Sequence, residues 1–145
     1  MSEKLHLVCA ACGAVNRVPL ERISDNPACG RCQQKVLSGE PVSLDTKSFE
    51  IFINRNDVPV VVDFWASWCG PCKAMAPAFA ETAMRMEPGV RFAKLDTEAA
   101  QSIAAKFGIR SIPTMIMFQA GKEMARQAGA MGAADIERWV RSVSK

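Results

Sequence analysis

The sequence lacks long apolar runs and clusters of charge of one sign. No stretch approaches the roughly 18 consecutive apolar residues of a membrane span, so we expect no membrane partner. The formal net charge of the 145-residue chain is only +3, with no run of consecutive Lys and Arg, which gives no support to a nucleic-acid partner. With 49% hydrophobic and 23% charged residues, the composition is that of a globular protein. We expect a monomer.

The N-terminus has no pattern of a secretory signal. The first residues include the acidic Glu3, and only a few apolar residues precede Cys9. A signal sequence begins with positive charge and continues with a longer apolar segment and a small-residue cleavage site. We therefore expect the reducing cytoplasm, where paired cysteines bind metal or carry out redox chemistry.

Six cysteines form three Cys-x-x-Cys pairs, at Cys9, Cys12, Cys29, Cys32, Cys69 and Cys72. In a small secreted chain an even number would indicate a disulfide framework. Four of them lie in the first 32 residues, and Ser38 to Pro41 has the composition of a turn or short linker. The sequence therefore predicts a small cysteine-rich module over residues 1–40 and a second domain over residues 41–145.

Beyond the linker, helical and extended patterns alternate. Helical spacing predicts helices over residues 46–54, 71–86, 98–107 and 134–143, the third ended by Gly108. Apolar, β-branched runs predict strands over residues 58–64, 90–95, 114–118 and 123–128, the last two joined by a tight turn. This order predicts an α/β domain, a mixed central sheet with helices on both faces.

Cys69 lies where the strand over residues 58–64 passes into a helix. Pro71 suits the first helical turn, where its missing N–H costs nothing. Cys69 would then face unpaired N–H groups and the positive end of the helix dipole, which favour the nucleophilic thiolate. Cys72 follows one turn later, within reach of Cys69 and more buried. The pattern predicts dithiol–disulfide exchange, with Cys69 attacking and Cys72 resolving the mixed disulfide.

Cys72 needs a base, and Asp63 near the end of the apolar strand is the candidate. A buried carboxyl has a raised pKa, which suits proton exchange near neutral pH, and Lys94 on another strand could be its partner. The alternatives are a strand-end carboxylate facing water and a solvated lysine. Half a metal site is a further alternative for Cys69 and Cys72, but no third cysteine lies nearby and the single histidine is His6.

The segment Trp65 to Lys73, Trp-Ala-Ser-Trp-Cys-Gly-Pro-Cys-Lys, resembles the active-site segment of the thioredoxin family. The likeness extends in family order to Asp63, to Pro77 and to residues 93–96, 109–114 and 129–130, and covers roughly residues 43–145. It implies a thioredoxin fold and a protein-disulfide reductase. It also implies two partners, an NADPH-dependent thioredoxin reductase and disulfide-containing client proteins.

The resemblance further implies a cis bond between Ile112 and Pro113 beside the cysteines. It implies a flat substrate-binding rim made of Trp68, Gly70, Pro71, Ile112, Pro113, Gly129 and Ala130. Gly and Pro between the two cysteines resemble reductases, whereas isomerases and oxidases of this fold often carry His there. A thiol oxidase or isomerase, and a zinc-dependent chaperone-like binding protein, are the alternative functions.

The N-terminal quartet has the spacing of a metal site. Cys12 and Cys29 are separated by sixteen residues, which matches the Cys-x2-Cys-x15–20-Cys-x2-Cys zinc pattern. Gly13 and Gly30 permit tight turns whose N–H groups can bond the sulfurs. Four thiolates leave no open coordination position, so one zinc ion with the ligands Cys9, Cys12, Cys29 and Cys32 would be structural rather than catalytic. The alternative is a redox-sensitive module, in which oxidative loss of zinc frees the ribbon from the catalytic domain and changes activity.

A module of this size cannot bury enough surface to fold unaided, so it needs the metal. Arg17, Arg31 and Lys35 are the nearby cations that could offset the charge of four thiolates. Two regulatory disulfides, or an iron centre with the same ligands, are the alternatives. A zinc ribbon ahead of a thioredoxin domain resembles the zinc-containing bacterial thioredoxin 2 group.

Overall fold

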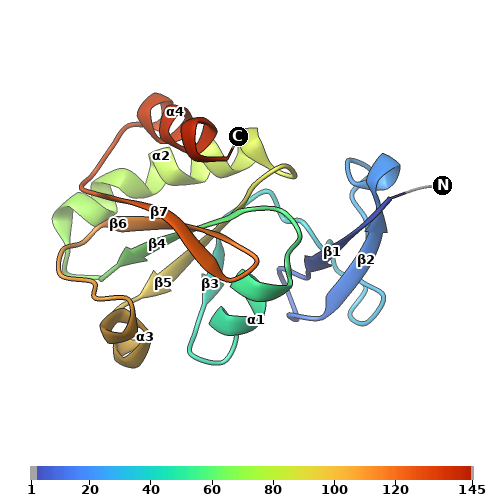
Figure 1. Cartoon of the computed structure of the whole chain (residues 1–145), viewed down its shortest axis with the longest axis horizontal. Coiled ribbons are helices and arrows are strands. Elements are labelled where there is room, and N and C mark those ends of the chain that lie inside the picture. The colour runs from blue at the N-terminus through green and yellow to red at the C-terminus, as the bar shows by residue number, and fades with distance from the viewer. Residues whose placement is uncertain (1–2, 145) are drawn as a thin grey trace.

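The chain forms two separate β-sheets, one of two strands and one of five (Figure 1). In the computed structural model, which describes residues 3–144, β1 (Lys4–Val8) and β2 (Val15–Pro19) form an antiparallel pair. The larger sheet has the order β3-β5-β4-β6-β7 and consists of β3 (Val42–Leu44), β4 (Val60–Trp65), β5 (Arg91–Asp96), β6 (Thr114–Gln119) and β7 (Lys122–Ala128). Strands β3, β5 and β4 run parallel, and β6 and β7 are antiparallel to their neighbours. The sheet is mixed, as predicted.

Helices cover both faces of the larger sheet (Figure 1). They are α1 (Phe49–Arg55), α2 (Gly70–Met86), α3 (Gln101–Lys106) and α4 (Ala133–Val143), and one 3₁₀ turn, η1 (Leu20–Arg22), follows β2. Helices α2 and α4 lie on one face, α1 and α3 on the other. None of the helices within residues 3–144 is long and apolar enough to cross a membrane.

The predicted elements of the larger domain are present with shifted ends. Helix α1 begins three residues later than predicted because the Asp45 carboxylate accepts the N–H groups of Lys47 and Ser48 in a turn. Gly108 follows α3 with a φ of +63°, the predicted left-handed position. Three strands, β1, β2 and β3, were not predicted; β3 has only three residues and no apolar run.

Strand β4 is buried on both faces, which explains its uninterrupted apolar sequence. Because side chains alternate along a strand, Val60, Val62 and Phe64 enter the core beneath α1 and α3, whereas Val61 packs toward α2 and α4. Asp63 shares the face of Val61. The strand therefore directs one carboxyl group to the side of the sheet that α2 covers.

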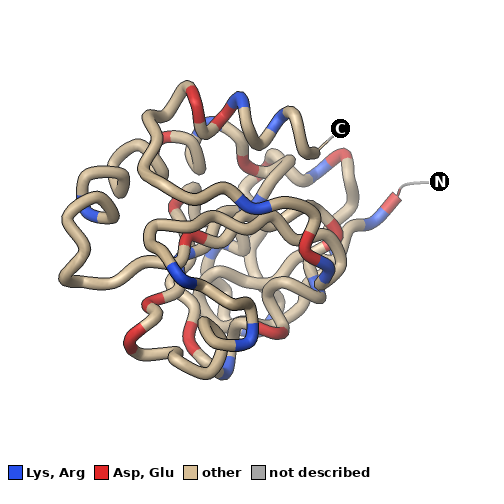
Figure 2. The backbone as a smooth tube through the Cα atoms, turned by 60° about the vertical axis from the view of Figure 1, so that its left-hand side comes forward, with Lys and Arg blue, Asp and Glu red and all other residues tan. Residues whose placement is uncertain are grey.

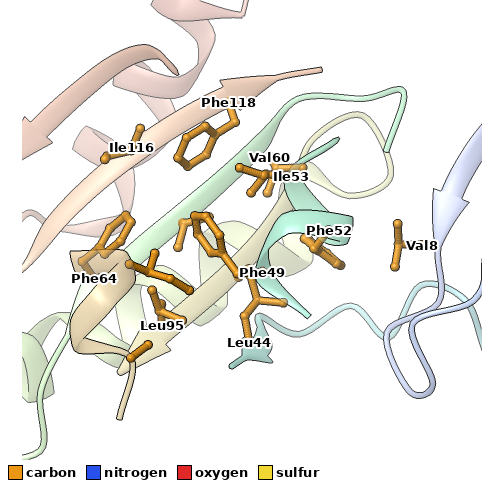
Figure 3. Close-up of a cluster of buried hydrophobic side chains, with 14 residues drawn as sticks. Val8, Leu44, Phe49, Phe52, Ile53, Val60, Phe64, Leu95, Ile116 and Phe118 are labelled. Atoms are coloured by element: carbon orange, nitrogen blue, oxygen red, sulfur yellow. The ribbon is translucent and has the colours of Figure 1, made fainter. Parts of the chain in front are cut away.

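The small module packs directly on the larger domain. Val8 at the end of β1 belongs to the same buried cluster as Phe49 and Phe52 of α1, and Figure 3 shows Val8 facing Phe52. Phe49 makes edge-on contacts with Phe64, Phe107 and Phe118 in that cluster. Conversely, Val58 of the larger domain lies in the core of the small module. The two modules thus share hydrophobic cores.

Charge is mixed over the molecule. Figure 2 shows Lys and Arg interspersed with Asp and Glu along the chain, in keeping with the small net charge. The ends of the two predicted domains, residues 1–2 and 145, lie outside the described residues.

Candidate active site and metal centre

Cys69 is the residue that caps the N-terminus of α2. Its sulfur accepts the backbone N–H of Cys72 at 3.2 Å, and Pro71 lies in the first turn, where no N–H partner is needed. The two cysteines form a disulfide with their Cα atoms 5.3 Å apart. The predicted pairing is therefore present, and Cys69 faces the positive end of a helix dipole.

Burial distinguishes the two cysteines only slightly. Cys72 is 3% exposed and Cys69 4%, so in the disulfide form Cys72 is the more buried of the two by a small margin. Their positions do differ, because Cys69 precedes the helix whereas Cys72 lies within its first turn. The sulfur of Cys69 is also 3.7 Å from the carbonyl oxygen of Ile112.

The Ile112–Pro113 peptide bond is cis, as the resemblance implies. Ile112 packs against Ala66, Cys69 and Cys72, and the N–H of Gly129 donates to the carbonyl of Pro113 at 2.9 Å. The loops before β6 and after β7 thus meet beside the disulfide.

Most of the predicted rim is open to solvent. Trp68 is 69% exposed, and Gly70, Pro71, Gly129 and Ala130 are exposed as well. Ile112 is half-buried. Pro113 is buried, which differs from the expected place on the surface rim, because it leads directly into the buried strand β6.

Asp63 is only 1% exposed, and neither of its carboxylate oxygens has a hydrogen-bond partner among the described residues. Burial raises the pKa of Asp63 to about 7, and the charge of Lys94 partly opposes that rise. The alternative of a strand-end carboxylate facing water is wrong. A carboxyl group with this pKa gains and loses a proton near neutral pH.

Lys94 lies beside Asp63 in the register of β4 and β5. Its ammonium group is 4.7 Å from the centre of the Trp65 ring, and its side chain is half-buried. Lys94 therefore affects Asp63 through its charge, with the ammonium held over the indole.

The four N-terminal cysteines come together in the small module. Their sulfur atoms all lie within 4.8 Å of one another, with 3.7 Å between Cys9 and Cys32 and 3.6 Å between Cys12 and Cys29. Sulfurs bound tetrahedrally at about 2.3 Å from one zinc ion would be about 3.8 Å apart. The four residues therefore fit a tetrahedral metal site.

Hydrogen bonds to the sulfurs lower the pKa values of these thiols, whereas desolvation and the closeness of the other sulfurs raise them. The side-chain amide of Asn16 and the N–H of Arg31 donate to Cys29, whose pKa falls to about 6, with Asn16 the largest cause. At Cys32 the Gln34 backbone lowers the pKa, but desolvation and the other three sulfurs raise it to about 12. Four thiolates this close require a cation among them.

One of the two predicted turn glycines has a different role. Gly13 has a φ of +79°, and the N–H of Ala11 bonds the sulfur of Cys9, as expected for a tight turn. In the second pair the left-handed residue is Gln33, at a φ of +69°. Gly30 instead donates its N–H to the Asn16 side chain, whose amide nitrogen donates to the sulfur of Cys29 in the same pair.

Two family models match the chain. The model of thioredoxin matches residues 40–142, and the model described as Thioredoxin 2, N-terminal, matches residues 8–34. The chain belongs to the thioredoxin family. It is a thiol-disulfide oxidoreductase of that family, with the four-cysteine ribbon of the thioredoxin 2 type at its N-terminus.

Similar proteins cover the chain to different extents. Thioredoxin C-3 of Corynebacterium nephridii is 47% identical over 134 residues, which is 92% of this chain and 92% of that one. Thioredoxin of Haemophilus influenzae is 35% identical over 101 residues, 70% of this chain and 94% of that one. A solved structure of a mutant thioredoxin from Halobacterium salinarum superposes with a TM-score of 0.66 at 26% identity, covering 74% of this chain and 93% of that one.

The sequence patterns did not predict the roles of two residues, Asn16 and Arg91, that hydrogen-bond to residues of the ribbon. Asn16, whose side chain bonds Cys29 and Gly30 of the second cysteine pair, has no sequence signal apart from its place between the two pairs. Arg91 is fully buried at the start of β5 and donates to the carbonyl of Val8 at 2.6 Å. A charged residue inside the apolar run of residues 90–95 was the available signal for Arg91.

Proposed function

We propose that the chain is a protein-disulfide reductase whose attacking residue is Cys69. The Cys69 thiolate attacks one sulfur of a client disulfide, and the other client sulfur leaves as a thiolate. The Cys72 thiolate then attacks Cys69, releases the second client sulfur and forms the Cys69–Cys72 disulfide. The client gains two electrons and the chain loses two. The position of Cys69 at the N-terminus of α2, its sulfur accepting the N–H of Cys72, is the observation that carries this proposal.

Asp63 is proposed as the acceptor of the Cys72 proton. It lies on the face of the sheet covered by α2, and burial raises the pKa of Asp63 to about 7, close to the pH at which the proton must move. Lys94 keeps that pKa from rising further.

The client segment is proposed to bind in extended form across the rim. The Ile112–Pro113 backbone is directed toward Cys69, and a strand-like segment could pair with it as an added strand does. Trp68, Gly70, Pro71, Gly129 and Ala130 supply the exposed surface around it. The rim offers little charge, which suits clients of varied sequence.

The ribbon is proposed to hold one structural zinc ion through Cys9, Cys12, Cys29 and Cys32. Soft thiolates at tetrahedral spacing favour zinc over hard cations. We place the domain boundary between residues 40 and 41. We also propose an NADPH-dependent thioredoxin reductase as the electron donor, disulfide-containing proteins as clients, and the cytoplasm as the compartment.

The direct test is a coupled assay of the full chain with NADPH, thioredoxin reductase and a protein disulfide. With the wild type, thioredoxin reductase is expected to oxidise NADPH at a rate that depends on the client, and Cys69→Ser is expected to abolish that rate. Absence of turnover by the wild type would refute the reductase. A thiol oxidase would instead show a markedly more oxidising potential for the Cys69–Cys72 pair, and a chaperone-like protein would retain its activity in Cys69→Ser.

Trp68→Ala is expected to raise KM for a protein disulfide about tenfold and leave stability within about 0.5 kcal/mol, because the exposed indole touches clients more than core. Met84→Ala is the matched control, since Met84 is 68% exposed against 69% for Trp68 but lies on the last turns of α2. Steady-state kinetics and urea denaturation measure both. An equal effect of the two variants on KM would contradict the proposed rim.

Metal analysis is expected to give one zinc ion per wild-type chain and well under one for Cys29→Ser. The loss follows from breaking a closed four-thiolate set. Cys69→Ser is the control of the same residue type and is expected to keep its full zinc content. Equal zinc in all three proteins, or iron in place of zinc, would contradict the proposed ligand set.

A further inference from the structure

Arg91 crosses from the larger domain into the ribbon. It is the largest of the fully buried side chains, at 0% exposure, although it begins a strand of the thioredoxin sheet. Its Nη1 donates to the carbonyl of Val8 at 2.6 Å, and its Nη2 donates to the carbonyl of Val36 at 3.2 Å. Val8 immediately precedes Cys9, and Val36 follows the second cysteine pair.

The Val36 carbonyl is the point where the two cysteine pairs meet. It also accepts the N–H of Ala10, which lies between Cys9 and Cys12, at 3.0 Å. The planar guanidinium therefore holds the chain on both sides of the metal centre with two donors of fixed geometry. A displacement of Arg91 would remove both of these hydrogen bonds from the chain that carries the two pairs.

A carboxylate, an aromatic ring and an amide oxygen surround the buried guanidinium of Arg91. Glu87 lies 3.5 Å from its Nε, and the guanidinium carbon is 4.9 Å from the centre of the Phe52 ring. Asn56 accepts both an Arg91 N–H at 3.0 Å and the N–H of Val8 at 2.9 Å. Glu87 also accepts the N–H of Gly39 at 3.0 Å. The facing atoms of the pair, Arg91 Nε and Glu87 Oε2, have no hydrogen-bond partner among the described residues, so charge attraction joins them, while the other polar atoms of both side chains bond to neighbours.

The guanidinium also interacts electrostatically with Cys9, one of the four proposed zinc ligands. Burial lowers the pKa of Arg91, while the charges of Glu87 and of Cys9 oppose that effect. The cations named from the sequence, Arg17, Arg31 and Lys35, are all exposed, so water screens their charges. A desolvated and immobile positive charge acts on a cluster of four thiolates more strongly than an exposed one does, although Glu87 offsets part of the charge of Arg91.

We propose that Arg91, a residue of the catalytic domain, is a positioning residue for the ribbon's zinc site and sets its zinc affinity. This proposal rests on the proposed zinc site. Arg91 acts through the carbonyls of Val8 and Val36, which hold the two cysteine pairs at bonding distance, and through its charge. Zinc binding and attachment of the ribbon to the catalytic domain stabilise each other, since the coupling is reciprocal.

The test is a zinc competition titration of the full chain against a chromogenic chelator. Arg91→Lys keeps the charge but cannot donate to both carbonyls, and we expect it to weaken zinc binding at least tenfold. Arg91→Met combined with Glu87→Gln removes the charge without leaving a buried carboxylate unpaired, and we expect a larger loss. Disulfide reduction by each variant verifies that the catalytic domain is folded.

Two controls separate this role from general effects. Lys35→Met removes an exposed cation of the ribbon and is expected to change zinc affinity less than twofold. Val58→Ala loosens the apolar contact between the modules without touching Arg91, and is expected to weaken zinc binding less than Arg91→Lys does.

Wild-type affinity in both Arg91 variants, or an equal loss in Val58→Ala, would overturn the inference and leave the zinc site standing. A wild type without zinc would overturn both. If the double variant fails to fold, Arg91→Lys decides alone. Should Arg91→Lys also fail to fold, Val58→Ala decides: a zinc loss of tenfold or more from that variant would overturn the inference, and a smaller loss would support it.

Discussion

Cys72→Ser is expected to stop turnover halfway and leave the chain bound to its client through Cys69. The first attack needs only the thiolate at the N-terminus of α2, which the variant retains, whereas the resolving thiol is absent. We expect steady-state reduction to fall on the order of 1,000-fold or more, as for loss of a nucleophile. Non-reducing electrophoresis and mass spectrometry of the variant with an oxidised client would detect the one-to-one adduct.

Cys69→Ser is the matched control for this experiment. It removes the capping sulfur, leaves Cys72 within the first turn of the helix, and is expected to form no adduct. Addition of dithiothreitol should release the client from Cys72→Ser, since the link is a disulfide. An adduct formed by Cys69→Ser in comparable yield would reverse the proposed roles of the two cysteines.

The parts of the fold that sequence could predict are those with local causes. The uninterrupted apolar run of β4 follows from burial on both faces, and Pro71 after Cys69 follows from the rules of helix N-termini. The four-cysteine spacing likewise predicted a cluster that the structure shows with metal-site distances. In each case a few adjacent residues determine the outcome.

The parts that could not be predicted depend on contacts between distant segments. Strand β3 is three residues long and exists because it pairs with β5. Arg91 looked like an interruption of an apolar strand, and only its contacts with Val8 and Val36, 83 and 55 positions away, explain it. The burial of Pro113 likewise follows from where β6 lies in the sheet, which no local pattern contains.

Asp63→Asn is expected to stabilise the protein at pH 8 by as much as about 4 kcal/mol, at 1.36 kcal/mol for each pKa unit. The pKa of Asp63 is about 7 in the folded chain, against 3.8 for the free side chain. Between these values the folded state holds a proton that the unfolded state has lost. The contribution of Asp63 to wild-type stability is therefore greatest below pH 4 and is lost as the pH rises through about 7. The asparagine variant lacks this loss.

Urea denaturation from pH 4 to pH 8.5 measures the difference, which should be near zero at the acid end and largest above pH 7. Asp45→Asn is a useful control, because backbone and side-chain hydrogen bonds from Ser48 lower the pKa of Asp45. Removing the Asp45 carboxylate should lower the free energy of unfolding at pH values above the pKa of Asp45 in the unfolded chain. This change is opposite in sign to the one expected for Asp63→Asn. A stability gain in Asp63→Asn that does not change with pH would mean that burial of the charge is not the cause.

The same substitution is expected to slow catalysis while it stabilises the fold. Without a carboxylate to take the proton of Cys72, the resolving step should slow about 100-fold near neutral pH, the usual contribution of a positioned base. Single-turnover kinetics from pH 6 to pH 9 would show the deficit shrinking as Cys72 ionises without help. An unchanged resolving rate at pH 7 would leave the buried carboxyl of Asp63 without a catalytic role, and its cost to stability would then be uncompensated.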